Sequence, residues 1–330
     1  MQWDKGYTSS YYMTIIDPAT WRDVDTVRIT GGTVSRSGTG LMQSADIDCT
    51  EFSEGVEKWI RIYLDTTQNG AHAHEALFTG LATSPGKRQH GWRAEYGITC
   101  YSVLKPCQDV VLPRGWYASG DTGRIIKDLL FPSPAPVEIA DGAPTLTAPI
   151  IAEDKETNLT MLGKILTAIG WRLRIIGDGR VEATPQKEVK YVLGADLDVV
   201  ETEISINEDW FKCPNVLRCT DGGLTAIARD DSLSSPLSTV NRGREVWASE
   251  SNCDLAGESL AEYAKRRLKA LQQIERTATY NRRYLPDLYP GDLVDVRYEA
   301  LSGRYEVDKQ TIKLGHAAAT SEQIKTTGGS

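Results

Sequence analysis

The stretch that decides the fold reads LPDLYPGDLVDV at residues 285–296. Its Pro-Gly-Asp turn joins two runs in which apolar and polar residues alternate, at 276–284 and 292–298. Alternation with a period of two predicts strands with one buried face, and a glycine after a proline marks the turn between them. Two more alternating runs follow, at 303–307 and 310–314. The C-terminal third is therefore expected to form a set of strands around this turn.

A long helix is predicted just before these strands, at about 255–273, because apolar residues recur on one of its sides. Its other side carries four basic residues, Lys265, Arg266, Arg267 and Lys269. Strand-like runs precede the helix at 216–220, 224–228 and 244–248. Before them, residues 195–209 contain six acidic residues and no basic one, which is typical of a solvated strand or loop.

The middle of the chain, 105–190, combines helical and strand periods. One predicted helix ends before Pro132, and a second runs from about 156 to 169. An alternating strand at 171–175 and a tight Gly-Asp-Gly turn follow, which indicates a compact α+β unit. Residues 132–149 contain five prolines and are expected to form an extended surface connection.

The first 104 residues read as strands separated by turn signals. Alternating runs occur at 45–49, 59–64, 76–81 and 96–101, and glycine pairs or Pro-Gly and Asn-Gly steps interrupt them. This pattern predicts a small barrel or sandwich.

Composition excludes several classes of protein. The chain has 45 acidic and 37 basic residues, a net charge of −8, which disfavours sequence-specific binding to nucleic acid. No apolar run approaches the roughly 20 residues of a membrane-spanning helix, so no integral membrane segment is expected. The N-terminus lacks the features of a secretory signal, and six scattered cysteines are too sparse for a disulfide framework. Free thiols and synthesis in a cytoplasm are therefore expected.

Sequence signatures of catalysis are missing, and no cofactor or metal is expected. The four pairs of neighbouring acids, Asp46 and Asp48, Asp196 and Asp198, Asp230 and Asp231, and Asp292 and Asp295, fit a glycosidase pair or simply the polar faces of strands. A metal site would need His72, His74, Glu75 and the distant His90, but two histidines in a polar loop are more often solvated.

The basic helix face is the candidate interaction surface. Beyond the helix it is extended by Arg282 and Arg283. This face could bind a polyanion or an acidic partner, or it could be the ordinary solvated side of an amphipathic helix. Its partner in a neighbouring subunit would be the acidic stretch, whose candidate residues are Glu201, Glu203 and Asp209.

In its order of elements, the chain resembles the baseplate hub proteins of bacteriophage tails. This family includes the late-control-type tail proteins and is related to the hub part of type VI secretion spikes. The resemblance rests on the long helix, the strand at 276–284, the Pro-Gly-Asp turn and the GRYEV strand at 303–307. The helix, Gly-Trp strand and Gly-Asp-Gly hairpin at 158–185 resemble the hub's middle, and 12–47 resembles its first barrel more loosely.

The resemblance implies an α+β, mostly β chain with two small β-barrel domains that flank a compact α+β unit. The expected domains are an N-terminal barrel at 1–104, the α+β part at 105–190, a second barrel with one long helix at 191–318, and a flexible tail at 319–330. Three copies would form a ring, and the 14 Tyr and 8 Trp against 4 Phe would suit its subunit contacts.

Such a homotrimer would be a structural adaptor in the virion tail, made in the host cytoplasm. It would join the sixfold tube or distal tail protein to a threefold spike or fibre protein, and would also meet the tape measure protein. Its acidic balance would suit a channel through which DNA slides without binding. The residues also allow two other functions. One is a tail-associated hydrolase that cleaves carbohydrate or peptidoglycan with a carboxylate pair, and the other is a polyanion-binding module.

Overall fold

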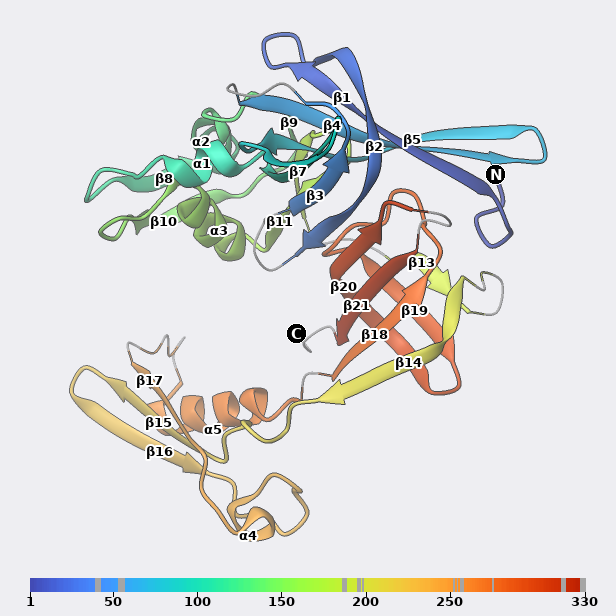
Figure 1. Ribbon diagram of the computed structural model, residues 1–330. Helices are drawn as coiled ribbons and strands as arrows, with labels where there is room; N and C mark the ends of the chain where they lie inside the picture. Colours follow the sequence, from blue (N-terminus) through green and yellow to red (C-terminus); the bar gives the residue numbers. More distant parts are fainter. Residues whose placement is uncertain are drawn as a thin grey trace. The chain divides into compact units, whose positions relative to one another are not determined.

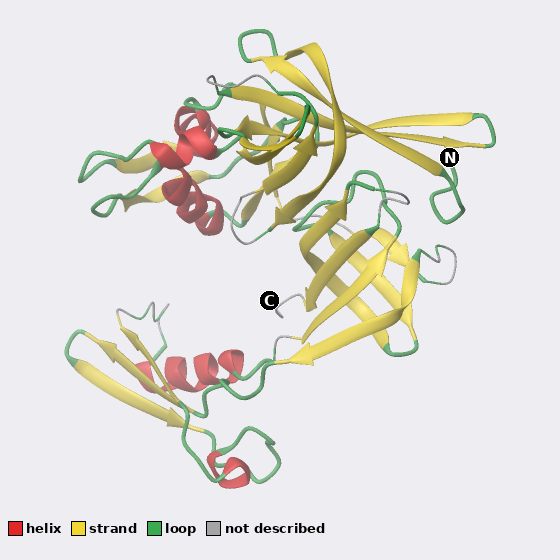
Figure 2. Ribbon diagram, in the orientation of Figure 1, coloured by secondary structure: helices red, strands yellow, loops and turns green. Residues whose placement is uncertain are grey.

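The computed structural model describes residues 1–38, 43–52, 57–185, 189–194, 197, 199–251, 253, 255, 258–274, 276–315 and 319–326. The chain divides into two compact units (Figures 1 and 2). Unit 1 consists of Met1–Ile204 and Thr279–Ile324, and unit 2 of Ser205–Ala278 and Lys325–Ser330. The described part is mostly β, as expected, with twenty-one strands and five helices.

The N-terminal strands of unit 1 pair in a closed cycle. They are β1 (Thr8–Asp17), β2 (Arg22–Ser37), β3 (Gln43–Cys49), β4 (Lys58–Gln68), β5 (Ala71–Ala82), β6 (Gly86–His90) and β7 (Arg93–Ser102). The pairing order is β1-β4-β5-β7-β3-β2, and β2 pairs back with β1, while β6 adds to β7. The alternating residues predicted to point inward, such as Ile47, Ile60 and Ile62, are at most 2% exposed and share one apolar core.

A helical layer with small sheets forms the middle of unit 1. Its elements are α1 (Lys105–Asp109), β8 (Tyr117–Asp121), α2 (Thr122–Leu130), β9 (Val137–Ile139), β10 (Thr145–Ile151), α3 (Asn158–Ala168), β11 (Trp171–Ile175) and β12 (Val181–Pro185). Asp121 caps α2, and Thr157 with Thr160 forms a capping box on α3. The proline-rich connection differs from the expectation, because β9 pairs with β12 and β10 with β8.

The remaining strands extend the N-terminal sheet. They are β13 (Val189–Leu193), β14 (Val200–Glu208), β18 (Arg276–Arg282), β19 (Leu293–Tyr298), β20 (Leu301–Lys313) and β21 (Thr320–Thr326). From β2 the order continues β20-β21-β18-β14, and β19 pairs with β20 and β13. The strands predicted around the Pro-Gly-Asp turn are thus present, and β14 lies at the end of this order. The boundaries between the two units fall within β14, β18 and β21.

The prediction of a flexible tail at 319–330 is wrong for residues 320–326, because these residues form β21. Thr320, Glu322 and Ile324 are fully buried along one side of this strand. Two of these three inward positions are polar, so the apolar alternation that reveals a strand is missing. Residues 327–330 lie outside the described part.

Unit 2 is a two-layer structure of its own. Its elements are β15 (Val216–Asp221), β16 (Leu224–Arg229), α4 (Thr239–Arg242), β17 (Trp247–Ser251) and α5 (Leu260–Leu271). The order is β16-β15-β17, and α5 covers one face of this sheet. The structure therefore places the predicted long helix on a sheet of unit 2 and not on the strands around the Pro-Gly-Asp turn. Ser259 and Glu262 form the capping box that starts the helix.

The turn between β11 and β12 ties the middle of unit 1 to the strand cycle. Thr79 Oγ1 donates to the Gly177 carbonyl at 2.8 Å, and Arg61 Nη2 donates to the Asp178 carbonyl at 2.9 Å. A Cβ placed on Gly177 would lie 1.7 Å from the carbonyl oxygen of Ala76. The glycine is therefore required for a close approach of two backbones.

Replacing Gly177 by alanine is expected to lower the free energy of unfolding by about 1–3 kcal/mol or more, because the backbone of β5 must shift. Gly163→Ala is the matched control, since a Cβ there meets nothing within 4 Å and alanine favours a helix. The control should raise stability by about 0.5–1 kcal/mol. Urea unfolding measures both, and equal effects of the two substitutions would contradict the close approach.

Candidate functional site

The basic face of α5 is partly neutralised within the chain. Arg266 contacts Glu258 at 2.5 Å, and Arg267 contacts Glu250 at 2.7 Å. Arg266 also lies over the ring of Tyr263, 5.2 Å from its centroid. Lys265 and Lys269 are exposed. The four residues thus lie on one exposed helix, as predicted, but only the two lysines keep their charge clear of these ion pairs.

Arg282 is not a surface residue, which corrects its place among the interaction candidates. Its side chain is 1% exposed and pairs with Glu322, with Nε donating to Oε1 at 2.9 Å. Inward and outward positions alternate along β18, and Arg282 falls on the inward side. Arg283, next to it, is exposed and donates to the carbonyl of Asp4.

Glu322 is the centre of a buried polar cluster. It also accepts hydrogen bonds from Tyr280 Oη at 2.8 Å and from Gln310 Nε2 at 2.7 Å. Burial by itself raises the pKa of a carboxyl, but the charge of Arg282 and these hydrogen bonds outweigh it and lower the pKa of Glu322. The cluster joins β18, β20 and β21.

The acidic candidates Glu201, Glu203 and Asp209 are all exposed, as predicted for a solvated strand. Glu201 and Glu203 lie on β14, and Glu201 accepts a hydrogen bond from Asn281 at 3.3 Å. Asp209 follows the strand and lies 3.9 Å from Lys212. The structure brings none of these three acids into an ion pair with the described residues of α5.

The Pro-Gly-Asp turn is the point where the segments of unit 1 meet. Asp292 is 1% exposed, and its Oδ1 accepts from Arg172 Nη2 at 2.7 Å. Its Oδ2 lies 3.5 Å from Arg174 Nη2 and accepts from the Tyr289 amide at 2.9 Å. Both arginines come from β11. The carboxylate therefore fixes the turn to the middle of the unit.

Tyr289 connects the same turn to the N-terminal strands. Its ring lies between two guanidinium groups, 4.6 Å from that of Arg36 and 5.1 Å from that of Arg174. Its hydroxyl accepts a hydrogen bond from the Gly177 amide at 3.1 Å. Asp287 binds Lys190 and Arg174, and although burial opposes it, these cations lower the pKa of Asp287. This arrangement holds the unit together.

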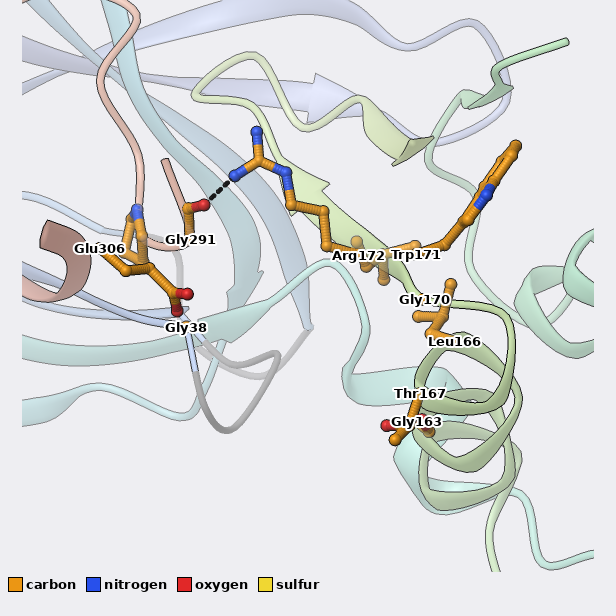
Figure 3. A pocket seen from close by; sticks show the side chains of 11 residues that line it. Gly38, Gly163, Leu166, Thr167, Gly170, Trp171, Arg172, Gly291 and Glu306 are labelled. Carbon is orange, nitrogen blue, oxygen red and sulfur yellow. Dashed lines mark hydrogen bonds between the residues drawn. The ribbon is translucent and has the colours of Figure 1, made fainter. Parts of the chain in front are cut away.

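Beside this turn lies a pocket of about 420 Å³. Its wall includes Leu166 and Thr167 of α3, Arg172 of β11, and Gly291 and Glu306 (Figure 3). Figure 3 shows Arg172 reaching across to the carbonyl of Gly291, to which Nη1 donates. Glu306 is the single carboxylate among the described residues of the wall. The pocket can take an apolar group, but it does not supply the two carboxylates that glycoside hydrolysis needs.

In each of the three acid pairs that the structure describes, at least one carboxylate has a partner within the chain. Asp292 is committed to two arginines, while Asp295 points to the exposed Arg297 at 3.1 Å. Asp46 accepts a hydrogen bond from Thr99 at 2.8 Å, and Asp230 caps the turn at Ser232. The pair Asp196 and Asp198 lies outside the described residues.

Both histidines of the pair contact neighbouring side chains. His74 Nδ1 lies 2.6 Å from Asp65 Oδ1, and its ring stacks on that of Tyr63 at 4.4 Å. His72 contacts Thr67 Oγ1 at 3.0 Å. The side chain of His90 lies outside the described part, and the described side chains contain no group of three potential metal ligands.

The cysteines are free in the structure, as expected, and five of the six are buried. Burial raises the pKa of the Cys49 and Cys107 thiols to about 11, so both are inert at neutral pH. None of the described helices combines the length and the apolar character that a bilayer crossing requires.

No family model matches the chain, and no curated protein does. Solved structures do resemble it. The 43 kDa tail protein of prophage MuSo2 from Shewanella oneidensis is 15% identical, with a TM-score of 0.65 over 96% of this chain and 97% of that one. The tail protein from Neisseria meningitidis MC58 gives 15% identity and a TM-score of 0.65, over 97% of each chain.

A third structure is a component of the type VI secretion system, the E. coli c3393 protein, described as similar to the T4 bacteriophage tail proteins gp27 and gp5. It is 10% identical, with a TM-score of 0.50 over 92% of this chain and 74% of that one. These structures come from phage tails and from a secretion system. They are the same two groups of proteins that the order of elements in the sequence indicates. The sequence resemblance is thus confirmed at the level of the fold, and over nearly its whole length the chain has the fold of phage tail proteins.

Proposed function

We propose that this chain is a structural, non-enzymatic subunit of a phage or phage-like tail. The observation that carries the proposal is the likeness to two tail proteins over 96% and 97% of the chain. Both of their chains are covered to 97%, so the likeness extends over nearly the whole of each tail protein. The ion pairs that occupy Asp292 and the single carboxylate of the pocket also favour a structural role.

Within the tail, we infer the role of a trimeric hub. The closed cycle of six strands supports a first barrel, and a second is supported by β13, β14, β18, β19, β20 and β21. Three chains with two barrels each would form a pseudo-sixfold ring. Such a ring would join a sixfold tube or distal tail protein to a threefold spike or fibre protein, and would contact the tape measure protein.

The charge of the chain supports passage of DNA through this ring. With 45 acidic against 37 basic residues, an acidic lumen would repel the phosphates and let DNA slide. The exposed acids Glu201 and Glu203 are proposed contact residues for a neighbouring subunit. A structure of the ring with a basic lumen would contradict the channel.

Light scattering of the purified protein tests the hub role. A mass of three times the 36.4 kDa chain is expected, and electron micrographs should show rings with a central hole. The trimer should grow with protein concentration, because oligomerisation follows mass action. A compact monomer at every concentration would contradict the hub.

A further inference from the structure

One face of the unit 2 sheet is partly open: Val216 on it is buried, but Arg218 is exposed. The face toward α5 buries Leu217, Cys219 and Ala228. Side chains alternate along a strand, so the neighbours of these residues point the other way. Arg218 and Ile227 are cross-strand partners on that second face, and Trp247 lies beside them on β17. Ile227 is 55% exposed and Trp247 45% exposed.

Exposed apolar side chains gather in unit 2. Seven of the sixteen large apolar side chains exposed in the described residues belong to it: Trp210, Phe211, Leu224, Ile227, Leu233, Val240 and Trp247. Unit 2 is the smaller unit, so this share is out of proportion to its length. Single exposed apolar side chains are ordinary, but Ile227 and Trp247 share one face with Arg218, and exposed apolar groups that share a face mark an interaction surface.

The backbone that carries two of these rings is held by hydrogen bonds. The carbonyl of Phe211 accepts from Arg242 Nη2 at 2.6 Å and from Arg244 Nη2 at 2.7 Å, and Arg244 also lies 4.1 Å from the centre of the Phe211 ring. Trp210 contacts Phe211 edge to face at 6.4 Å. Side chains that are fixed before binding lose less entropy when a partner covers them. This segment is therefore prepared for contact.

The same segment is fastened to the end of the sheet where β15 and β17 begin. The side chain of Asn215 is buried, and its Oδ1 accepts from the Val246 amide at 2.7 Å. Its Nδ2 donates to the carbonyl of Arg244 at 2.9 Å. The segment with the two rings therefore lies next to this end of the sheet.

Charge indicates what covers the face. Unit 2 holds eleven of the 45 acidic and eleven of the 37 basic residues, so the whole excess of eight acids belongs to unit 1. The open face itself carries Arg218, which lies over the Trp247 ring at 5.4 Å, and Arg229, which pairs with Glu245. Arg218 beside the Trp247 ring on one unit and an acidic excess on the other fit two copies of this chain.

Unit 1 offers a matching acidic element. β14 is the last strand of its sheet order, and Glu201 and Glu203, two positions apart, are both exposed. Because residues two apart point to the same side of a strand, the two carboxylates form one acidic row. The face of α5 is a poorer match for this row, since Arg266 and Arg267 already have partners in the chain.

We propose that the open face of the unit 2 sheet docks on the acidic row of β14 in a second copy of the chain. Arg218 faces Glu201 and Glu203 of that copy, and the Trp247 ring is covered by the contact. The inference rests on the proposed trimer and assigns one of its contacts. It is heterologous, since two different surfaces meet, and three such contacts close a ring.

Charge reversal tests this contact in the full-length protein. Arg218→Glu, and separately Glu201→Arg with Glu203→Arg, should each weaken association by about tenfold or more, because like charges then face each other. All three substitutions together should restore association to within about threefold of the unchanged protein. Analytical ultracentrifugation measures the association constants, and circular dichroism confirms that every variant is folded.

Apolar and basic controls separate this face from other surfaces. Trp247→Ser should weaken association, whereas Phe131→Ser, at a side chain that is 87% exposed in unit 1, should not. Lys265→Glu with Lys269→Glu reverses the charge of α5 and should also leave association unchanged.

The outcomes distinguish the contact from the trimer. If the unchanged protein associates while Arg218→Glu and Trp247→Ser associate equally well, the contact is wrong and the trimer stands. Reversals that weaken association without restoring it in combination would overturn β14 as the partner element. If the unchanged protein never associates, the proposed trimer itself fails.

Discussion

Replacing Glu322 by glutamine is expected to lower the free energy of unfolding by about 3–5 kcal/mol, because the buried guanidinium of Arg282 loses its counter-charge. Arg282 and Glu322 are 1% and 0% exposed, so water cannot take the place of the carboxylate. Glutamine keeps the volume, but its amide nitrogen puts a donor where a carboxylate oxygen accepted, so the loss combines the missing charge with missing acceptors. Urea or guanidinium unfolding measures the difference.

The pH dependence of stability offers an independent reading of the same pair. The pKa of Glu322 is lowered in the folded protein, so this group stabilises the fold above its unfolded pKa, and that stability is lost as the pH falls through the lowered folded value. Glu322→Gln should therefore flatten the acid branch of the stability curve.

A double substitution separates the charge from the packing. Arg282→Met with Glu322→Met should recover most of the loss, since two apolar side chains of similar length leave no unpaired charge. A loss in Glu322→Gln below about 1 kcal/mol would mean that the pair is solvated and that β21 is only loosely held.

Much of unit 1 follows from apolar periodicity in the sequence. Strands such as those of Ile47 and Ile60 can be predicted because the residues that alternate as apolar in the sequence are the ones that are buried. The capped helices α2 and α3 were predictable for the same reason, with Asp121 and Thr157 marking their starts. In these elements the side chains that are buried are also the apolar ones.

The strands that carry buried charge were harder to predict. The sequence predicts a tail in place of β21 because Glu322 occupies one of the inward positions of this strand. It predicts a surface position for Arg282 because that residue follows a basic helix. Nothing in the sequence indicates that Arg282 and Glu322, which are 40 residues apart, form an ion pair. The partner of a buried charge depends on the tertiary fold, which local patterns do not contain.

The candidate interaction surface shows a similar division. The basic side of α5 was predictable from helical spacing, but Glu250 and Glu258, which neutralise part of it, lie outside the helix. The open face of the unit 2 sheet was not found, although Arg218, Ile227 and Trp247 all lie in predicted strand runs. Tertiary packing decides which face of the sheet α5 covers. The exposed face can therefore be identified only from the structure.

Replacing Asp292 by asparagine is expected to lower the free energy of unfolding by about 3 kcal/mol, because Arg172 would lose its carboxylate, while Arg174 keeps Asp287 and Glu182. The side chains of Asp292 and Arg174 are 1% and 4% exposed, and that of Arg172 is 13% exposed. Asparagine still accepts the hydrogen bond from the Tyr289 amide, so the turn keeps its shape while the charge is removed. Denaturant unfolding and near-ultraviolet circular dichroism of Tyr289 and its surroundings measure the loss.

Asp295→Asn is the matched control three residues further along the same segment. Asp295 pairs with Arg297 where both are partly exposed, at 31% and 56%, so its loss should cost less than about 1 kcal/mol. The two variants also separate a structural acid from a catalytic one. If Asp292 were half of a hydrolytic pair, Asp292→Asn would abolish cleavage of cell walls and leave stability nearly unchanged. A large loss of stability, with no cell-wall cleavage by the unchanged protein, is the result expected for a carboxylate that holds unit 1 together.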